Sequence, residues 1–248
     1  MVNGIYTATE GMIPRIVQLD NVANNLANVS TNGYKKSSVF LRSLISADQA
    51  LEHAQGTDRT ERPEEVWVDY TQGTFEETEE KLDIALNGSG FLRVLNTENN
   101  TVYYTRDGHF HRDLNGVLVN DENMMLLDDE FNIIIADGTD VHIMGNGDLY
   151  VDGEQVATIG LADFSENDYP MLRGIGQGLF EKPAAVAETI SSSSTQFLQG
   201  YLEDANVDSV MSMVEMIEIF RAFELGQKAV QIQDGTLERV VTEVGSIS

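Results

Sequence analysis

Apolar residues recur at alternating intervals of three and four positions at both ends of this 248-residue chain. The N-terminal series runs through Ile5, Ala8, Met12, Arg15, Leu19, Val22, Leu26 and Val29, with Arg15 as its polar member. The C-terminal series runs through Met213, Met216, Phe220, Phe223, Gln227, Val230, Asp234, Leu237, Val241 and Val244. This spacing places side chains on one stripe of a helix, which a second helix must cover. Because isolated short helices are marginally stable in water, we expect the two chain ends to pack against each other or against the ends of neighbouring copies.

The N-terminal helix is expected to span about residues 4–29 and to stop within the segment ANNLANVSTNGYKK, residues 23–36. The side chains of residues 30–32 can hydrogen-bond local backbone groups, and Gly33 can adopt a positive φ, so a helix does not continue easily through them. Pro14 lies well inside the predicted helix. A mid-helix proline costs about 3 kcal/mol, so we expect a kink at Pro14 or a helix that begins near it.

The next segment, residues 37–72, has a weaker pattern and is predicted to be an extended linker. A short helical piece that ends near residue 51 is indicated by Phe40, Leu41, Leu44 and Ile45. A charged loop is expected over residues 56–65. The alternation over residues 66–70 suits an edge strand, in which Trp67 is either a packing anchor or an interface anchor.

Residues 73–196 have the pattern of an antiparallel β domain. Asp-Gly or Asn-Gly pairs recur along it, and five that we expect to form turns begin at Asp107, Asn115, Asp137, Asn146 and Asp152. Such pairs favour the turns of β-hairpins. Short runs of strand-forming residues lie between and after them.

The last segment, residues 197–248, is predicted to be a C-terminal helical arm. Asp204 or Asn206 can cap its helix, which is expected to reach about residue 244. The arms formed by residues 1–36 and 197–248 therefore bracket the β domain. The predicted fold class is α+β, with a discontinuous helical coiled-coil domain from both termini and an inserted, mainly antiparallel β domain.

The composition restricts the partners of the chain. With 15 Lys and Arg against 41 Asp and Glu, the net charge is −26, which argues against nucleic acid or an anionic membrane surface as a partner. The chain has no cysteine, so disulfides and thiolate metal sites are not available. Residues 1–19 lack the features of a cleaved signal peptide. No stretch is apolar over the length that spans a bilayer, so no membrane insertion is expected.

Three groups of residues could carry chemistry, and for each a structural role is the preferred interpretation. His109 and His111 could bind a metal with a nearby aspartate, but they lack a third defined ligand. The glycines of residues 174–178 lack the lysine and the flanking elements of a phosphate-binding loop. The acidic residues 128–130 do not match a calcium-binding loop. The sequence therefore predicts no catalytic residue, no cofactor and no metal site.

Three blocks of the sequence resemble flagellar basal-body rod and hook proteins. They are ANNLANVSTNGYKK at residues 23–36, LDIALNGSGFLRV with YTRDGHFHRDLNGVLV at residues 82–94 and 104–119, and QGYLEDANVDSVMSMVEMIEIFRAFELGQKAV at residues 199–230. The blocks have the same order, and lie at the same ends of the chain, as in that family. The opening GIYTATEGM resembles the proximal rod protein more than the distal one. A distal rod or hook-type subunit is the alternative within the family.

The resemblance implies a structural subunit of the bacterial flagellar basal-body rod, without catalytic activity or a cofactor. Copies of the chain, together with other axial rod proteins, would assemble through their terminal helices into a tubular shaft that transmits torque. Rod proteins leave the cell through the flagellar type III export apparatus without a cleaved signal peptide and assemble in the periplasm, so the same is expected here. Outside the family, the alternative is an oligomeric β-domain binding module or enzyme.

The candidate assembly interface combines residues that match the family's terminal blocks with members of the two apolar series. It comprises Leu19, Val22, Asn24, Asn25, Leu26, Ala27, Asn28, Ser30, Gly33, Asn206, Val207, Met213, Met216, Ile217, Phe220, Arg221, Phe223, Glu224 and Lys228. Arg221, Glu224 and Lys228 are spaced so that two ion pairs could form along one helix face or be offered to a neighbour. Such surface pairs contribute only about 0.3–0.5 kcal/mol, which favours a role in setting register.

Overall fold

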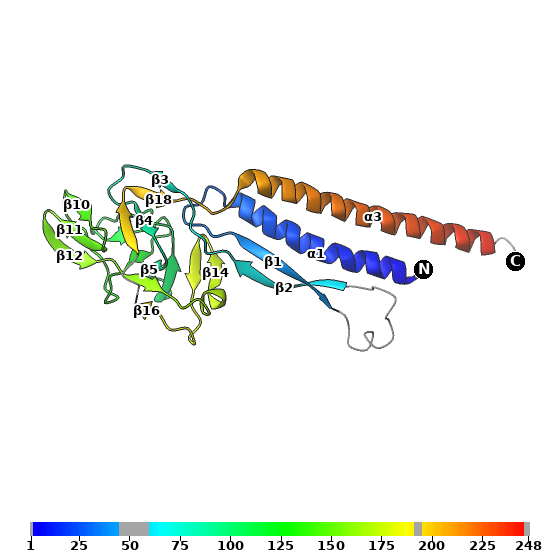
Figure 1. The fold of residues 1–248 in the computed structure, drawn as a ribbon, viewed down its shortest axis with the longest axis horizontal. Helices are drawn as coiled ribbons and strands as arrows, with labels where there is room; N and C mark the ends of the chain where they lie inside the picture. Colours follow the sequence, from blue (N-terminus) through cyan, green and yellow to red (C-terminus); the bar gives the residue numbers. More distant parts are fainter. Residues whose placement is uncertain (1, 45–59, 191–194, 246–248) are drawn as a thin grey trace. The chain divides into compact units, whose positions relative to one another are not determined.

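The chain folds as two compact units, which the computed structural model describes over residues 2–44, 60–190 and 195–245. The helical unit combines Met1–Ala27, Ser37–Asp69 and Asp208–Ser248. The β unit combines Asn28–Lys36 and Tyr70–Val207. The presence of long helices and several antiparallel sheets confirms the predicted α+β class (Figure 1).

The boundaries of the units differ from the predicted domain boundaries at both arms and at the linker. Residues 28–36, expected in the N-terminal arm, and residues 197–207, expected in the C-terminal helical arm, belong to the β unit. The segment expected as an extended linker supplies two strands to the helical unit, β1 (Ser37–Leu44) and β2 (Thr60–Val68). The short helix predicted around residues 40–51 is therefore wrong over its described part. The charged loop predicted over residues 56–65 is strand from Thr60 onward, and its earlier part lies outside the described residues.

Helix α1 (Val2–Ala27) lies between the β1–β2 hairpin and helix α3 (Ser209–Gly245) (Figure 1). It packs against α3 and against both strands of the hairpin. Pro14 lies inside α1, so the alternative in which the helix begins near this proline is wrong. The helix ends at Ala27, slightly before the predicted end at about residue 29.

Helix α3 is capped by a residue that the sequence analysis did not single out. Oδ1 of Asp208 accepts hydrogen bonds from the backbone N of Val210 at 2.9 Å and of Met211 at 3.0 Å. Asp208 therefore satisfies two of the amide groups that the first turn of a helix leaves unpaired. The two residues proposed as caps, Asp204 and Asn206, bond within the β unit instead.

The face of α3 that packs against α1, here called its inner face, only partly matches the predicted series. Every second predicted position is correct, and at the others the residue one position earlier in the sequence is the buried or half-buried one. The members of the inner face are the buried or half-buried Ser212, Met216, Ile219, Phe223, Gly226, Val230 and Gln233. Met213 and Phe220, which the series placed on this face, are exposed. Gly226 allows a close approach of the helices, because a Cβ there would lie 2.8 Å from Cγ of Met12.

The strands of the β unit pair antiparallel throughout its described residues. The largest sheet has the order β14 (Arg173–Gly176), β15 (Leu179–Glu181), β6 (Thr101–Thr105), β5 (Phe91–Asn96), β9 (Met125–Leu126), β8 (Leu118–Val119) and β7 (His111–Arg112). Strand β13 (Leu161–Asp163) pairs with β5 and with β16 (Thr189–Ile190). A three-stranded sheet contains β10 (Val141–Ile143), β11 (Asp148–Val151) and β12 (Glu154–Thr158). Two further pairs join β4 (Ile84–Asn87) to β17 (Gln196–Gln199) and β3 (Phe75–Glu77) to β18 (Tyr201–Glu203), and a short 3-10 helix covers Tyr169–Met171.

Three of the five predicted hairpin turns are confirmed. The pairs that begin at Asn115, Asn146 and Asp152 connect β7 to β8, β10 to β11 and β11 to β12, each with its glycine at positive φ. The pairs that begin at Asp107 and Asp137 do not connect paired strands, so these two predictions are wrong. Gly108 is needed for a different reason, because a Cβ there would lie 1.7 Å from the carbonyl oxygen of Ile84.

Gly33 and Gly153 give a matched test of backbone crowding. Both have positive φ, +65° and +90°, but a Cβ on Gly33 would lie 2.3 Å from the carbonyl carbon of Arg106, whereas Gly153 faces open space. We expect Gly153→Ala to lose about 1–2 kcal/mol, the ordinary cost of the left-handed conformation for a residue with a Cβ. Gly33→Ala should lose clearly more, as measured by chemical denaturation. Equal losses would contradict the close packing of Gly33 against Arg106.

Gly226 and Gly235 give a second matched pair, within α3. Gly235→Ala should stabilise the chain by about 1 kcal/mol, because alanine has the higher helix propensity and no atom lies within 4 Å of the new Cβ. Gly226→Ala should gain less or lose stability, since Met12 must move. Thermal unfolding followed by circular dichroism measures both changes. An equal gain at the two positions would show that α1 and α3 do not meet at Gly226.

Candidate assembly interface

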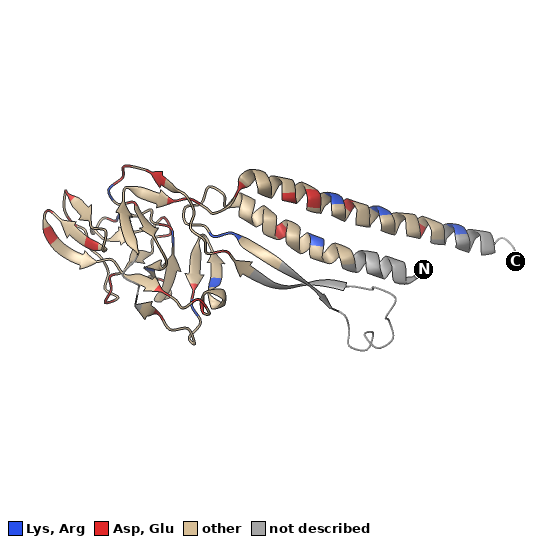
Figure 2. Ribbon diagram, in the orientation of Figure 1, with Lys and Arg blue, Asp and Glu red and all other residues tan. Residues whose placement is uncertain are grey.

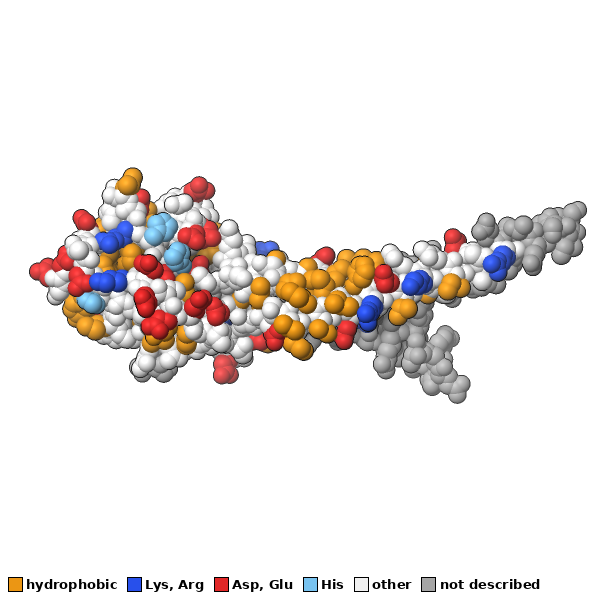
Figure 3. All heavy atoms as spheres, turned by 90° about the horizontal axis from the view of Figure 1, so that it is seen from above, with side chains coloured by type: hydrophobic (Ala, Val, Ile, Leu, Met, Phe, Trp, Pro, Cys, Tyr) orange, Lys and Arg blue, Asp and Glu red, His pale blue; other side chains and the backbone are white. Residues whose placement is uncertain are grey.

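The outer face of α3 carries large apolar side chains that the chain's own fold leaves in water. We define the outer face of α3 as its exposed residues Val210, Met211, Met213, Val214, Ile217, Phe220, Leu225 and Ile232. Phe220 is 49% exposed, whereas its neighbour Ile219 on the inner face is 8% exposed. Figure 3 shows hydrophobic side chains gathered into a patch along the N-terminal half of α3. A helix that is apolar on more than one side is normally buried by more than one neighbour.

Basic and acidic residues both occur along α3 (Figure 2). Arg221, Glu224 and Lys228 are all exposed. Within the described residues they form no ion pair with one another. The first of the two arrangements considered for them, pairing along a single helix, is therefore not present in this structure.

The residues of the candidate interface fall into three groups by exposure. Val22, Asn25, Gly33 and Val207 are buried. Leu19, Leu26, Asn28, Asn206, Met216 and Phe223 are half-buried. Asn24, Ala27, Ser30, Met213, Ile217, Phe220, Arg221, Glu224 and Lys228 are exposed. The last group exposes the largest fraction of its surface to a second molecule in this conformation.

Asn25 holds the start of the hairpin against α1 inside the helical unit. The residue is 1% exposed. Its Nδ2 donates to the carbonyl oxygen of Ser37 at 2.7 Å, and its Oδ1 accepts from the backbone N of Ser37 at 2.9 Å. Asn21 adds a hydrogen bond to Oγ of Ser37 at 2.8 Å. These bonds engage the backbone N and the carbonyl oxygen of Ser37, the residue where β1 begins and pairs with Val68 of β2.

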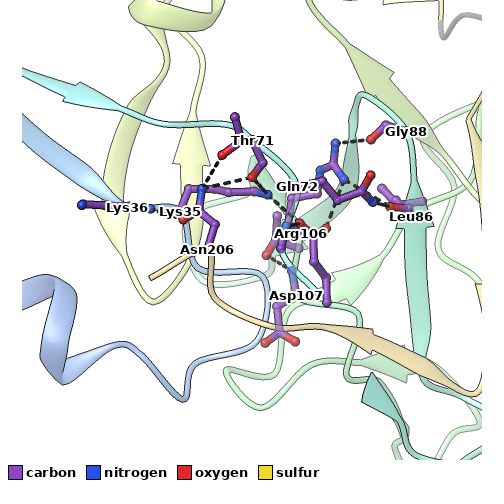
Figure 4. Close-up of polar contacts among 12 residues, drawn as sticks. Lys35, Lys36, Thr71, Gln72, Leu86, Gly88, Arg106, Asp107 and Asn206 are labelled. Carbon is purple, nitrogen blue, oxygen red and sulfur yellow. Dashed lines mark hydrogen bonds and ion pairs between the residues drawn. The ribbon is translucent and has the colours of Figure 1, made fainter. Parts of the chain in front are cut away.

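The side chain of Asn206 likewise connects separate backbone segments, here inside the β unit (Figure 4). Its Oδ1 accepts from the backbone N of Lys36 at 2.6 Å. Its Nδ2 donates to the carbonyl oxygen and to Oγ1 of Thr71, at 3.0 and 3.2 Å. One amide side chain thus joins three segments that are remote in the sequence, and this use of both its polar atoms explains why Asn206 is not the helix cap.

A buried ionic cluster centred on Glu203 lies in the same unit, and Figure 4 shows its members Lys35 and Arg106. Lys35 and Asn206 both donate to the carbonyl oxygen of Thr71. Oε1 of Glu203 is 2.6 Å from Nζ of Lys35, and Oε2 is 3.2 Å from a guanidinium nitrogen of Arg106. Glu203 also accepts from the backbone N of Gly73 at 2.9 Å. All three charged side chains are at most 5% exposed. Removing one member of such a buried pair costs about 3–5 kcal/mol, so the cluster fixes residues 28–36 to the β unit.

The sequence analysis did not identify this cluster, although it quoted all three charged residues. Lys35, Arg106 and Glu203 come one each from the three blocks that carry the family resemblance. A search for opposite charges shared among those blocks could have paired them. Spacing alone could not, since Lys35 and Glu203 are 168 positions apart.

The histidine pair considered as a metal site is divided in the structure. His111 is exposed on β7, while His109 precedes that strand and places Nδ1 2.8 Å from Oδ1 of the buried Asp83. Partial burial lowers the pKa of His109, but its hydrogen bond to Asp83 and the charges of Asp83, Asp121 and Asp107 raise the pKa above its ordinary value overall. Burial raises the pKa of Asp107 to about 6, against the hydrogen bond that Asp107 accepts from His109.

The other candidate chemical sites also have structural uses. Asp128 Oδ1 accepts from the backbone N of Glu130 at 2.8 Å and of Asn132 at 2.7 Å, which builds a turn in the acidic cluster. The glycines of residues 174–178 lie in and after β14, in the hairpin that β14 forms with β15. Over the described ranges, His, Cys, Asp and Glu side chains form no group of three or more that could hold a metal ion. No described helix is both apolar enough and long enough to cross a membrane.

His109 and Asp107 should make the protein more stable at mildly acidic pH. Both pKa values are raised on folding, so the stabilisation is complete below each unfolded pKa and is lost as pH rises through the folded one. For Asp107 this loss lies between 3.8 and about 6, and for His109 it lies above 6.5. The denaturant concentration at the midpoint of unfolding should therefore decrease as the pH is raised from about 5 to about 8.

The variant His109→Asn isolates one part of this pH dependence. Its amide can still donate to Asp83 but does not titrate. The fall in the denaturation midpoint above about pH 6.5 should become shallower, while the fall at lower pH remains. A variant profile that matches the wild type over the whole range would show that His109 does not contribute.

Comparison with known proteins identifies the same three blocks. The chain matches family models described as "Flagella basal body rod protein" at residues 5–35, "Flagellar hook protein FlgE/F/G D1 domain" at residues 85–151 and "Flagellar basal body rod FlgEFG protein C-terminal" at residues 198–243. These ranges contain the inner and outer faces of α3 and all three members of the Glu203 cluster.

Relatives that match over nearly their whole length have the same description. The flagellar basal-body rod protein FlgG of Borreliella burgdorferi is 30% identical over 257 residues, covering 96% of this chain and 97% of the relative. FlgG of Buchnera aphidicola subsp. Acyrthosiphon pisum is 28% identical over 260 residues, covering 97% and 99%. FlgF of Caulobacter vibrioides is 29% identical over 240 residues, covering 96% and 95%. The chain therefore belongs to the flagellar basal-body rod protein family and is a structural component of the rod, not an enzyme.

Proposed function

We propose that this rod protein associates with other copies of itself through the outer face of α3, and that other axial rod proteins are its further partners. The observation that carries the proposal is the continuous apolar patch on a helix that packs against α1 on its opposite side. Contiguous apolar patches on soluble proteins commonly mark surfaces that a partner covers.

The free energy available on this face is large enough to matter. Full burial of a large apolar side chain contributes about 1.5–3 kcal/mol. Side chains that are half exposed, such as Ile217 and Phe220, have about half of that left to gain. The whole outer face can therefore contribute on the order of 5–10 kcal/mol, against a cost of association of about 4–15 kcal/mol. Contacts with several neighbours favour association more strongly than one, which suits a subunit of a rod.

In this proposal α1 and α3 form a discontinuous coiled-coil domain, and the chain termini are the assembling parts. The two helices line a tube, and the β unit is inserted between them in the sequence. A contact between unlike faces does not close on itself, so repetition produces a tube or filament and not a dimer. Such a shaft can transmit torque because each subunit is held by neighbours along and around it.

The candidate residues divide into two roles. The exposed Met213, Ile217 and Phe220 contact neighbouring copies directly, and Arg221 with Lys228 and Glu224 selects the register of that contact. Buried residues such as Asn25 act indirectly, because they hold the chain in the conformation that presents the outer face. Leu26 and the other half-buried residues contribute the edges of the contact.

The proposal also includes the export route of the chain and its class among the rod proteins. We assign the chain to the periplasmic part of the flagellum, reached through the type III export apparatus without a cleaved signal peptide. We assign it to the proximal rod class on its opening segment GIYTATEGM. Overall identity supports neither subtype over the other, since FlgG relatives match at 27–30% and FlgF at 29%.

Substitution of Phe220 tests the outer face directly. Phe220→Asp places a charge where a neighbour must exclude water, so the concentration needed for assembly should rise by at least about 10-fold. Because Phe220 does not face α1, the unfolding free energy of the dissociated chain should change by about 0.5 kcal/mol or less. Sedimentation measures the first quantity and chemical denaturation the second.

Leu114→Asp is the matched control, since Leu114 is fully exposed in the β unit. The same change in chemistry there should leave assembly at its wild-type concentration. The proposal is contradicted if Phe220→Asp assembles like the wild type, or if both variants lose assembly to the same extent.

A further inference from the structure

The β1–β2 hairpin has one face on α1 and one face turned away from it. Ser37 faces α1, because its Oγ accepts a hydrogen bond from Asn21 at 2.8 Å. Side chains alternate between the two faces of a strand, and Ser38 pairs directly with Trp67 in the antiparallel register. Ser38 and Trp67 therefore lie on the face directed away from α1. We call this face the hairpin's outer side.

Trp67 is the single tryptophan of the chain and is 42% exposed. Its large ring can bury far more surface than the present fold covers, and tryptophan is enriched among the residues that dominate binding energies. A residue that serves only to pack a core would be buried, whereas the Trp67 side chain is exposed on a two-stranded hairpin. The role of interface anchor, one of the two considered for Trp67 from the sequence, is the better explanation.

We propose that the outer side of the hairpin, with Trp67 as its anchor, docks onto the outer face of α3 of a neighbouring copy. This inference rests on the proposed function and adds the surface that the α3 face binds. The helical unit has three layers, with α1 in the middle (Figure 1). Its two outer layers, α3 and the hairpin, therefore each keep one open side.

The two open sides differ from each other and complement each other. One is an extended apolar helix face and the other a narrow strand pair with a single large aromatic ring. Met211 and Met213 on the helix are flexible and form favourable contacts between sulfur and aromatic rings. A contact from α3 of one copy to the hairpin of the next leaves the same two surfaces free at the ends of the pair. It can therefore continue through many copies, as a rod requires.

Intrinsic fluorescence of the full-length chain tests the contact without any label. Trp67 gives the whole tryptophan signal, so its emission should shift to shorter wavelength at the concentration where sedimentation shows assembly. Trp67→Ala should raise that concentration by at least about 10-fold, and Trp67→Phe by less. Circular dichroism of the dissociated variants should match the wild type, because the lost side chain lies on the outer side.

Disulfide trapping identifies the partner surface, since the natural chain contains no cysteine. A chain with Ser38→Cys, mixed with a chain carrying Met213→Cys, should form a disulfide-linked heterodimer on mild oxidation. The two positions lie on layers separated by α1, so the bond must join different copies. A mixture of the Ser38→Cys and Leu114→Cys chains is the control and should give no more than background.

The outcomes separate this inference from the function on which it rests. Heterodimers together with a shifted Trp67 emission support the docking of hairpin on α3. Assembly that proceeds with unshifted Trp67 emission and no trapping above the control overturns the inference but leaves assembly through α3 intact. A wild-type chain that does not assemble at any concentration overturns both.

Discussion

The apolar surface of α3 extends further around the helix than α1 can cover. The inner face, with Ile219 and Phe223, is satisfied within the chain, while the outer face, with Ile217 and Phe220, remains in water. Exposure of this apolar surface to water raises the free energy of every isolated copy. In the proposed assembly, neighbouring copies cover this surface and relieve the penalty, which agrees with the structural role of the family.

The buried members of the terminal blocks fix the conformation within each of the two units. Asn25 fixes the hairpin to α1, and the Glu203 cluster fixes residues 28–36 within the β unit. Each device uses polar groups that are nearly or fully withdrawn from water, where an unpaired partner is costly. Their geometry is therefore specific. The buried residues of the family blocks maintain a defined conformation, and in the proposed assembly the exposed residues contact neighbouring copies.

The sequence predicted what depends on local pattern. Heptad spacing revealed both helices, and asparagine-glycine or aspartate-glycine pairs located three hairpins. It failed where tertiary contacts decide. Ser212 and Gly226 were passed over for the inner face, since neither is apolar and large, yet the lack of a side chain at Gly226 is what permits a close approach to Met12. The short helix predicted near residues 40–51 was wrong because residues 37–44 pair with β2, a tertiary contact that the spacing of Phe40, Leu41 and Leu44 does not reveal. The buried ion pair between Lys35 and Glu203 spans most of the chain and leaves no periodic signal.

An image reconstruction of assembled copies, at a resolution that separates side chains, tests the central claim most directly. The account predicts that the outer face of α3 is buried between copies, while Lys35, Arg106 and Glu203 keep their contacts within one copy. An assembly in which copies meet through their β units alone, with Ile217 and Phe220 still facing water, would contradict it.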